Sequence, residues 1–434
     1  MTHADTDSQS ADVRVTPPEA DPEIDSFTVR HEHRNLVVLA IHQILLRVAW
    51  VFKTESVIIP AFMDHIAGPG WLRGCLPVLN RVGQSVPQVY LADKLAKAGL
   101  KRHALTTTTG LMAVPFFVLV TVLLLTGNDH PIWLPAFYLF LYTFFFCVNG
   151  INVVSFGTVQ GKLIRADRRG RLMAIAGVGG SVGAIAAAWY LMRDWLQRAD
   201  GGYPLIFSLT GIGFTLAAVV TLLVVEVNQP VATRQPTGRA GIRRILRLLR
   251  SDIRLRRLSV VAMLFVSTQL LFPHYQALGR VHASWDHGRL MHWVIAQNAG
   301  AGLYGLLAGS LADRFGNRAA LRLLLTGVAL TPILALVLAN GERYWITFAV
   351  LGAVPVTFRT LTNYALELCE PDQHPVYISA LRLSMALPLL LSPLIGLWID
   401  ATSFSPAFLT IAGVTGTGAI LTFFMDEPRT AKCT

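Results

Sequence analysis

The sequence predicts an all-α membrane protein with twelve transmembrane helices arranged as two pseudo-symmetric six-helix bundles. Three observations support this fold class. Of the 434 residues, 53% are hydrophobic and only 15% are charged, which is more apolar surface than one or two soluble cores can bury. Leu-Ala-Asp followed by a basic residue occurs twice, at 91–94 and 311–314. A basic segment at 227–257 divides the chain into two similar halves.

Apolar runs of about 18 to 25 residues are long enough to cross about 30 Å of hydrocarbon. They place the first six helices near residues 35–62, 71–92, 104–126, 131–157, 171–193 and 204–226. They place the second six near residues 258–279, 290–312, 319–338, 344–368, 376–399 and 404–425. We therefore expect an N-terminal bundle at 35–226, a linker at 227–257 and a C-terminal bundle at 258–425.

The two ends of the chain are predicted to be tails. Residues 1–34 are rich in acidic residues and contain several prolines, so they cannot bury enough apolar area to fold and are expected to be disordered. They lack the basic region and the cleavage site of a secretory signal, so we expect the first helix to remain in the mature protein. Residues 426–434 form the second tail.

Basic residues gather in alternate loops. One set of loops contains Lys94, Lys97, Lys101, Arg102, Lys162, Arg165, Arg168, Arg169, Arg171, nine arginines between 234 and 257, Arg314, Arg318 and Arg322. The opposite set contains Arg73, Arg193, Arg198, Arg280, Arg289 and Arg343. By the positive-inside rule the first set, both tails and the linker are cytoplasmic. The formal charge of +11 therefore reflects the orientation of the chain in the membrane, and we expect no nucleic-acid partner. We also expect the protein to be a monomer in a bacterial inner membrane.

The linker combines arginines with isoleucines and leucines at helical spacing. Its arginines are Arg243, Arg244, Arg247, Arg250 and Arg254, interleaved with Ile242, Ile245, Leu246, Leu248, Leu249 and Ile253. One interpretation is an amphipathic helix that lies on anionic lipids near residues 239–257. The other is a solvated linker that only fixes the topology.

The segment from Gly309 to Arg318 resembles the G-x-L-A-D-R-x-G-x-[RK] loop of the major facilitator superfamily. The first half matches more loosely, because Val89 stands where Gly309 does and Gly99 follows Asp93 by six residues rather than three. The resemblance implies a secondary transporter in which two bundles rock to give alternating access.

The resemblance also implies a cytoplasmic gate. Asp313 is expected to accept hydrogen bonds from amides at the start of the 171–193 helix and to pair with Arg169 or Arg171. Asp93 is expected to bind backbone amides at the start of the 376–399 helix. The other expected members of the gate are Arg314 and Arg318. The alternative is that both aspartates cap turns in every state.

Arginines inside apolar spans are costly and need a function or a partner. Arg47 and Arg81 lie near the middle of their helices, and Arg359 lies slightly cytoplasmic of the middle; we expect all three to face a central cavity. Arginine forks match carboxylate and phosphate groups, so the expected substrate is a small anionic or zwitterionic organic solute. Each arginine could instead bind a helix carbonyl or Glu55. The other expected substrate-binding residues are Gln84, Asn149, Asn152, Gln269, His274, Gln297, Asn298 and Asn363.

Three residues are candidates for coupling transport to protons. Glu55 lies well inside an outer half of the membrane, and burial of a carboxylate favours its protonated form. On a continuous helix Lys53 would point about 200° away from it. His42 and His274 are further candidates because imidazole titrates near neutral pH, with a packing role as the alternative. Uniport or anion exchange fits the sequence as well.

Other classes of protein find little support. The four cysteines show no metal-ligand spacing, and no Walker loop, GxSxG, HExxH or Rossmann motif occurs, so we expect no enzyme activity, cofactor or metal. The sequence does not indicate the direction of transport, and two alternatives to a transporter of a small anionic or zwitterionic solute remain. One is an exporter of amphipathic, drug-like compounds, and the other is a non-transporting membrane receptor or assembly factor with the same fold.

Overall fold

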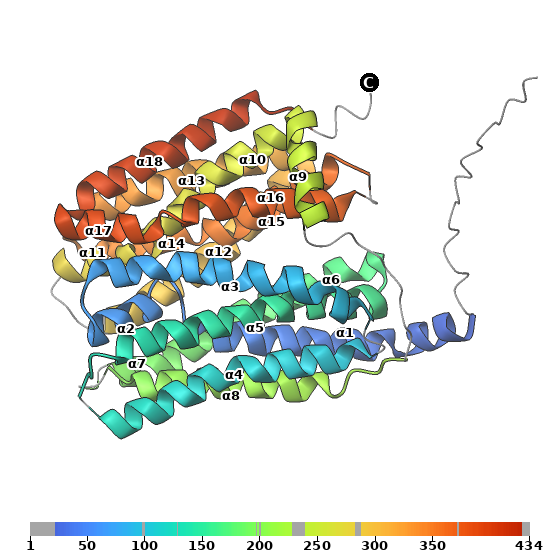
Figure 1. Cartoon of the computed structure of the whole chain (residues 1–434), viewed down its shortest axis with the longest axis horizontal. Coiled ribbons are helices and arrows are strands. Elements are labelled where there is room, and N and C mark those ends of the chain that lie inside the picture. The colour runs from blue at the N-terminus through green and yellow to red at the C-terminus, as the bar shows by residue number, and fades with distance from the viewer. Residues whose placement is uncertain are drawn as a thin grey trace, which may run out of the picture.

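The computed structural model describes residues 22–427 except 98–99, 128, 197, 199–200, 228–238, 283–287 and 371–372. This part of the chain contains helices and no β-strand. In Figure 1 the elements α1 to α8 lie in the lower half of the view and α10 to α18 in the upper half. The axes of most of the long helices are aligned, whichever way the chain runs along them (Figure 1). The two halves are the two predicted bundles.

The helices of the N-terminal bundle are α1 (Pro22–Val51), α2 (Ile58–Ile66), α3 (Gly70–Lys97), α4 (Lys101–Thr126), α5 (Leu134–Leu163), α6 (Ala166–Ala187), α7 (Arg193–Leu196) and α8 (Tyr203–Thr221). A short helix, α9 (Arg239–Ser251), lies between the bundles in sequence. The C-terminal bundle contains α10 (Ile253–Val266), α11 (Phe272–His282), α12 (Gly288–Phe315), α13 (Asn317–Leu338), α14 (Trp345–Leu351), α15 (Ala353–Glu367), α16 (His374–Leu389), α17 (Ser392–Ala401) and α18 (Phe404–Leu421). A π-helical turn joins α6 to α7 at Ala188–Met192, and 3-10 turns occupy Ser267–Leu271, Glu342–Tyr344 and Thr422–Phe424.

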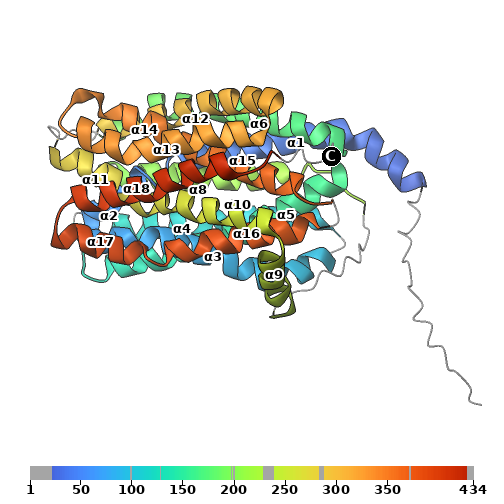
Figure 2. The same cartoon turned by 90° about the horizontal axis from the view of Figure 1, so that it is seen from above.

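Ten helical segments of the described chain are long and apolar enough to cross a membrane. The long helices α3 and α12 run alongside them (Figures 1 and 2), at the second and eighth places in the order of the chain, so the structure is consistent with twelve spans. Large apolar side chains cover the outside of the molecule; Leu125 is 82% exposed and Leu306 is 74% exposed. Together with helices long enough to span a bilayer, such an apolar outer surface is typical of a protein that contacts lipid.

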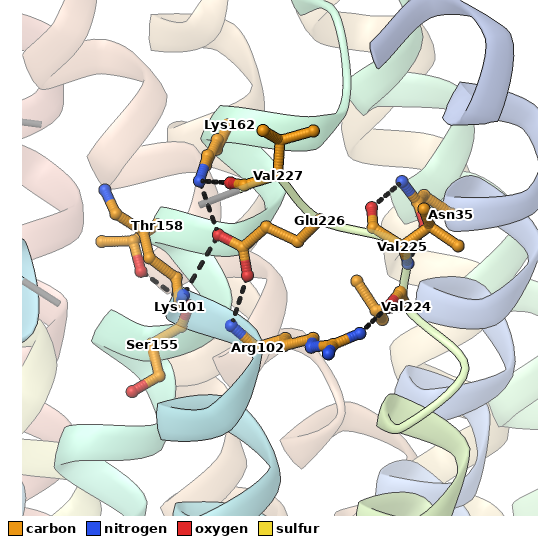
Figure 3. A network of polar contacts seen from close by, with 10 residues as sticks. All are labelled: Asn35, Lys101, Arg102, Ser155, Thr158, Lys162, Val224, Val225, Glu226 and Val227. Atoms are coloured by element: carbon orange, nitrogen blue, oxygen red, sulfur yellow. Dashed lines mark hydrogen bonds and ion pairs between the residues drawn. The ribbon is translucent and has the colours of Figure 1, made fainter. Parts of the chain in front are cut away.

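The internal duplication is visible at one end of the molecule, which we call the basic end. It is the end where α4 and α13 begin and where Lys162, Arg165 and Arg168 lie. Glu226 follows α8, and its side chain is completely buried. Its carboxylate accepts hydrogen bonds from the backbone N–H groups of Lys101 at 3.1 Å and Arg102 at 2.8 Å, and it pairs with the Lys162 ammonium at 2.8 Å (Figure 3). A buried carboxylate thus caps α4, because anions are favoured at helix N-termini.

The second half repeats this arrangement. Glu427 follows the last helix, and its carboxylate accepts a hydrogen bond from the backbone N–H of Arg318 at 3.2 Å, at the start of α13. The Arg318 guanidinium donates to the carbonyl of Met425 at 2.9 Å, as the Arg102 guanidinium donates to the carbonyl of Val224 at 3.0 Å. In both halves that carbonyl lies two residues before the glutamate. The two bundles are therefore built alike at this end.

The N-terminal boundary differs from the prediction. Helix α1 begins at Pro22, so the expected disordered tail is wrong for residues 22–34, and residues 1–21 lie outside the described part of the chain. Glu32 accounts for part of the difference, because its side chain is only 1% exposed and pairs with Arg165 at 3.1 Å and Arg168 at 3.0 Å. Asn35 also exchanges two hydrogen bonds of 2.9 Å with the backbone of Val225. These partners are distant in sequence, so composition alone did not reveal them.

Two of the spans are discontinuous at corresponding places. The first span is interrupted at residues 52–57, between α1 and α2. Its counterpart in the second half is interrupted by the 3-10 turn at Ser267–Leu271, between α10 and α11. Pro60 and Pro273 each lie just beyond the interruption. Interrupted helices expose backbone and side-chain polar groups in the middle of a membrane, which is tolerated where they line a cavity.

Candidate functional site

A cavity with two adjoining lobes lies between the bundles. The larger lobe has a volume of about 600 Å³ and the smaller about 390 Å³. Both lobes are lined by Trp50, Glu55, Gln269, Phe272, Pro355 and Phe358. These shared residues come from both interrupted spans and from α15, so both halves of the chain form the cavity.

The larger lobe is cationic. Arg47 from α1 and Arg359 from α15 both line it, from opposite bundles. Within the described part of the chain neither guanidinium has a hydrogen-bond or ion-pair partner, and the Nε of Arg47 is buried. A Cβ on Gly180 would lie 2.8 Å from the Cδ of Arg47, so α6 packs directly on the stem of this arginine. Guanidinium groups bind carboxylate and phosphate oxygens readily, so the chemistry of this lobe is compatible with an anionic ligand.

The smaller lobe contains the third predicted arginine. Arg81 from α3 lines it together with Asn80, Gln84 and Tyr142. The Arg81 guanidinium also donates a hydrogen bond to the backbone carbonyl of Arg382 in α16. Arg81 therefore has the structural partner that the sequence left open as an alternative, and it joins the two bundles beside the cavity.

Lys53 and Glu55 form an ion pair, which corrects the expected divergence of their side chains. The Lys53 ammonium lies 2.9 Å from Glu55 Oε1. The expected angle applies to a continuous helix, whereas α1 ends at Val51 and the chain turns between residues 52 and 57. The Lys53 side chain is 1% exposed, and its ammonium lies 3.2 Å from the centre of the Trp50 ring, in a cation–π contact.

Glu55 also connects this ion pair to the smaller lobe. Its second carboxylate oxygen accepts a hydrogen bond from Asn80 at 3.0 Å, and the Asn80 carbonyl accepts one from Gln84 at 2.7 Å. The four side chains Lys53, Glu55, Asn80 and Gln84 thus form one polar chain that ends in the cavity. Asn80 was not predicted, although it lies one helical turn before Gln84 on the same face.

Most of the predicted amide side chains line the cavity. Asn149, Asn152, Gln297 and Asn298 line the larger lobe, and Gln269 lines both lobes. The amide of Asn152 donates to Thr108 at 3.1 Å and Thr109 at 2.7 Å, so its N–H groups have partners within the bundle. Ser56 donates a hydrogen bond of 2.6 Å to Gln297. That bond connects the two halves at the cavity wall and was not predicted.

Three predicted residues lie away from the cavity lining. His274 in α11 is completely buried, and neither ring nitrogen has a hydrogen-bond partner among the described residues. His42 is also completely buried; its Nδ1 lies 3.0 Å from the carbonyl oxygen of Ala217, so the ring faces α8. Asn363 lies one turn beyond Arg359 and is exposed. These positions do not support the predicted binding roles of His274 and Asn363 or the predicted coupling role of either histidine, because none of the three lines either lobe.

The end of the molecule opposite the basic end is closed by contacts between the bundles. Asp400 of α17 accepts hydrogen bonds from the backbone N–H groups of Gly70 at 3.0 Å and Trp71 at 2.9 Å, at the start of α3. A Cβ on Gly396 would lie 2.6 Å from the carbonyl oxygen of Gly70, so the two helices meet backbone to backbone. Asp64, paired with Arg73 of its own bundle, lies 3.9 Å from Arg280 of the other bundle.

The predicted contacts at the basic end are not formed. Asp313 is exposed and has no hydrogen bond or ion pair within the described chain. Arg169 donates instead to the carbonyls of Ile164 and Gly161, and Arg318 binds Glu427. Arg171 and Arg314 are exposed, and the side chain of Asp93 lies outside the described part of the structure. The bundles meet at the opposite end in this conformation, whereas the Asp313 pairing is expected only when the basic end is closed, so that pairing stays a prediction.

Comparison with known proteins agrees with this architecture. The family model described as Major Facilitator Superfamily matches residues 278–434. The solved structure of a mutant of the nucleoside transporter NupG has a TM-score of 0.69 at 12% sequence identity, covering 90% of this chain and 99% of that one. A bacterial homolog of the human lysosomal transporter Spinster, in an inward-facing and occupied conformation, has a TM-score of 0.62 at 12% identity, covering 94% and 97%.

A third solved structure, the peptide transporter POT in complex with sulfate, has a TM-score of 0.63 at 14% identity and covers 90% of this chain and 94% of that one. No curated protein sequence matches the chain. The family model thus matches the C-terminal part of the chain, which contains the Gly309 to Arg318 loop, and the solved structures show that the whole chain shares the fold of these transporters. At these identities the solved structures establish the fold and leave the substrate undetermined.

Proposed function

We propose that this protein is a secondary transporter that moves a small anionic or zwitterionic organic solute by alternating access. The observation that carries the proposal is the placement of Arg47 and Arg359 in one lobe, from opposite bundles and without counter-ions. An anion bound between them would contact both halves at once. Such a ligand is well placed to drive the rocking of the bundles, because it stabilises the conformation in which both arginines reach it.

The state of the gates supports alternating access. The closed end is held by Asp400 and by close packing of Gly70 against Gly396, while Asp313 at the basic end is free of partners in the described chain. If the basic end is cytoplasmic, as its arginines indicate, this conformation faces inward. We further propose that the membrane is the inner membrane of a bacterium and that the chain acts as a monomer.

Proton coupling through Glu55 is part of the proposal. Glu55 lines both lobes and pairs with the buried ammonium of Lys53. Protonation of the Glu55 carboxylate would remove the negative partner of that ammonium. The cavity would therefore carry one more positive charge when Glu55 is protonated than when it is ionised. Transport of the solute together with a proton is the form of coupling that this arrangement favours.

An exporter of amphipathic compounds is the second candidate. Trp50, Phe272 and Phe358 line both lobes and offer an apolar belt between the arginines and the polar chain at Glu55. A ligand with an aromatic body and an acidic group would use both features. Neutral or cationic amphiphiles would use the belt alone, so their binding would not depend on Arg47 or Arg359.

A thermal-shift screen against pooled metabolites tests the proposal, since a ligand that binds only the folded state raises the melting temperature. Hydrogen bonds to charged groups contribute about 1.5–3 kcal/mol, so Arg47→Gln and Arg359→Gln should each weaken an anionic hit about tenfold or more. Arg193→Gln, an exposed arginine at the opposite end, is the matched control. Unaltered binding in both cavity variants would refute the anion site. Loss of binding in the control as well would show that the arginines act only through net charge.

A non-transporting receptor is tested by deleting residues 1–21. This deletion spares α1 and the contacts of Glu32. A transporter should retain most of its flux, whereas a receptor that binds a partner through its acidic tail should lose that partner.

A further inference from the structure

Helix α9 lies across the basic end of the molecule. Figures 1 and 2 both show its axis crossing the direction of the long helices, so it runs parallel to the plane of the membrane. It contacts α16 and α10, and its partly buried residues Ile245, Leu248 and Leu249 pack on the core of the protein. With the long helices spanning the bilayer, a helix held across their basic end would lie near the lipid headgroups.

The outer surface of α9 is cationic. Arg243, Arg247 and Arg250 follow a spacing of i, i+4 and i+7, so they form one stripe, and all three are exposed. Arg244 is also exposed, and Leu246 beside the stripe is 47% exposed. Within the described chain no acidic side chain pairs with these four arginines. The helix therefore presents unneutralised charge next to an exposed leucine.

The nearest acid in sequence is already occupied. Asp252 caps α10 by accepting hydrogen bonds from the backbone N–H groups of Arg254 at 2.8 Å and Leu255 at 3.2 Å. Its other oxygen accepts a hydrogen bond of 2.6 Å from the hydroxyl of Tyr377 in α16. Asp252 thus fixes the junction between α9 and the bundle, and its carboxylate does not neutralise the arginine stripe.

We infer that α9 is a docking surface for anionic lipid headgroups of the leaflet at the basic end. The arginine stripe would bind lipid phosphates, and Leu246 would enter the boundary between headgroups and acyl chains. Charge complementarity selects an anionic partner. The orientation of α9 selects a membrane surface, because the bundle holds the stripe at headgroup level along the edge of the protein.

The size of the effect follows from the charges. Each arginine near an anionic surface contributes about a fivefold gain in affinity. Removing the three arginines of the stripe should therefore weaken the interaction about a hundredfold. Because α9 packs on α16, and Asp252 directly after α9 accepts a hydrogen bond from Tyr377 of α16, lipid binding should also raise the stability of the whole C-terminal bundle.

The test compares the full-length protein in mixed micelles of phosphatidylglycerol or phosphatidylcholine, with melting temperature as the readout. The variant Arg243→Gln/Arg247→Gln/Arg250→Gln removes the stripe, and Arg193→Gln/Arg198→Gln/Arg343→Gln removes the same charge from exposed positions at the opposite end. Phosphatidylglycerol should raise the melting temperature of the unmodified protein and of the control variant, with half of the effect at similar lipid concentrations. The stripe variant should require a lipid concentration about a hundredfold higher for the same effect. Equal midpoints in all three proteins, or equal stabilisation by both lipids, would overturn the inference.

Two further arms identify the source of the anion. A fluorophore attached through Leu246→Cys should shift its emission to the blue in nanodiscs that contain phosphatidylglycerol and remain unshifted in phosphatidylcholine alone. Inositol hexakisphosphate, a soluble polyanion, should not reproduce the stabilisation at matched charge. Unshifted emission in both lipids, or full stabilisation by the soluble polyanion, would show that α9 does not dock on the membrane.

Discussion

Neutralising Glu55 should destabilise the protein because it leaves the Lys53 ammonium buried without an anion. Lys53 is 1% exposed and Glu55 is 23% exposed. Removing one partner of a buried ion pair costs about 3–5 kcal/mol. The Trp50 ring, 3.2 Å from the ammonium, still offsets part of this cost, since a desolvated cation–π contact contributes about 2 kcal/mol. For Glu55→Gln we therefore expect a loss near the lower limit, about 3 kcal/mol.

The companion change tests the reasoning. Lys53→Met removes the buried charge, so Lys53→Met/Glu55→Gln should recover most of the lost stability, because apolar replacement of a buried pair is often neutral or stabilising. The assay is thermal unfolding in detergent. A loss of about 3 kcal/mol corresponds to a fall of about 6 °C at a slope of about 2 °C per kcal/mol. An unchanged melting temperature in Glu55→Gln, or a double variant no more stable than the single one, would refute the proposed energetics of the pair.

The other predictions concern the gates, the repeat and the cavity boundary. Gly396→Val should prevent closure at the Gly70 contact, because a Cβ there would lie 2.6 Å from the Gly70 carbonyl oxygen. The labelling rate of a cysteine introduced into the cavity, with reagent added from that end, should rise. An unchanged rate would contradict the proposed gate. Glu226→Gln should cost about 2–3 kcal/mol because it leaves the Lys162 ammonium, 12% exposed, without its carboxylate. Glu427→Gln should cost less because Arg318 is 34% exposed; the reverse order of melting temperatures would contradict this. His274→Phe should leave ligand binding unchanged in the thermal-shift assay, and a tenfold loss would place His274 back in the site.

Much of the fold follows from the sequence because hydrocarbon imposes a minimum length on every span. The repeated Leu-Ala-Asp turn also marked the corresponding loops of the two halves. The interruption at residues 52–57 did not follow, because apolar patterning reports burial and carries little information on a local change of backbone direction. That omission produced the wrong geometry for Lys53 and Glu55, since residues two apart diverge only on an unbroken helix.

The cavity lining was predictable where a charged side chain inside a span had no partner nearby in the sequence. Arg47 and Arg359 line the cavity as expected, and they stood out in the sequence because arginines inside apolar spans are costly. His274 and Asn363 do not line the cavity, because a polar residue on a helix can face its own bundle or solvent as well as the cavity. Asn80 and Ser56 were missed because their partners, Glu55 and Gln297, become neighbours only after the spans pack together.

Uptake of an anionic solute into proteoliposomes tests the central claim most directly. The solute is the one that gives the largest thermal shift, and the proteins are the unmodified chain, Arg47→Gln/Arg359→Gln and Arg193→Gln. Saturable uptake by the unmodified chain and the Arg193 variant, with loss in the double variant, is the predicted result. Uptake no greater than in empty liposomes, or equal uptake by all three proteins, would contradict a transporter that binds its cargo between these two arginines.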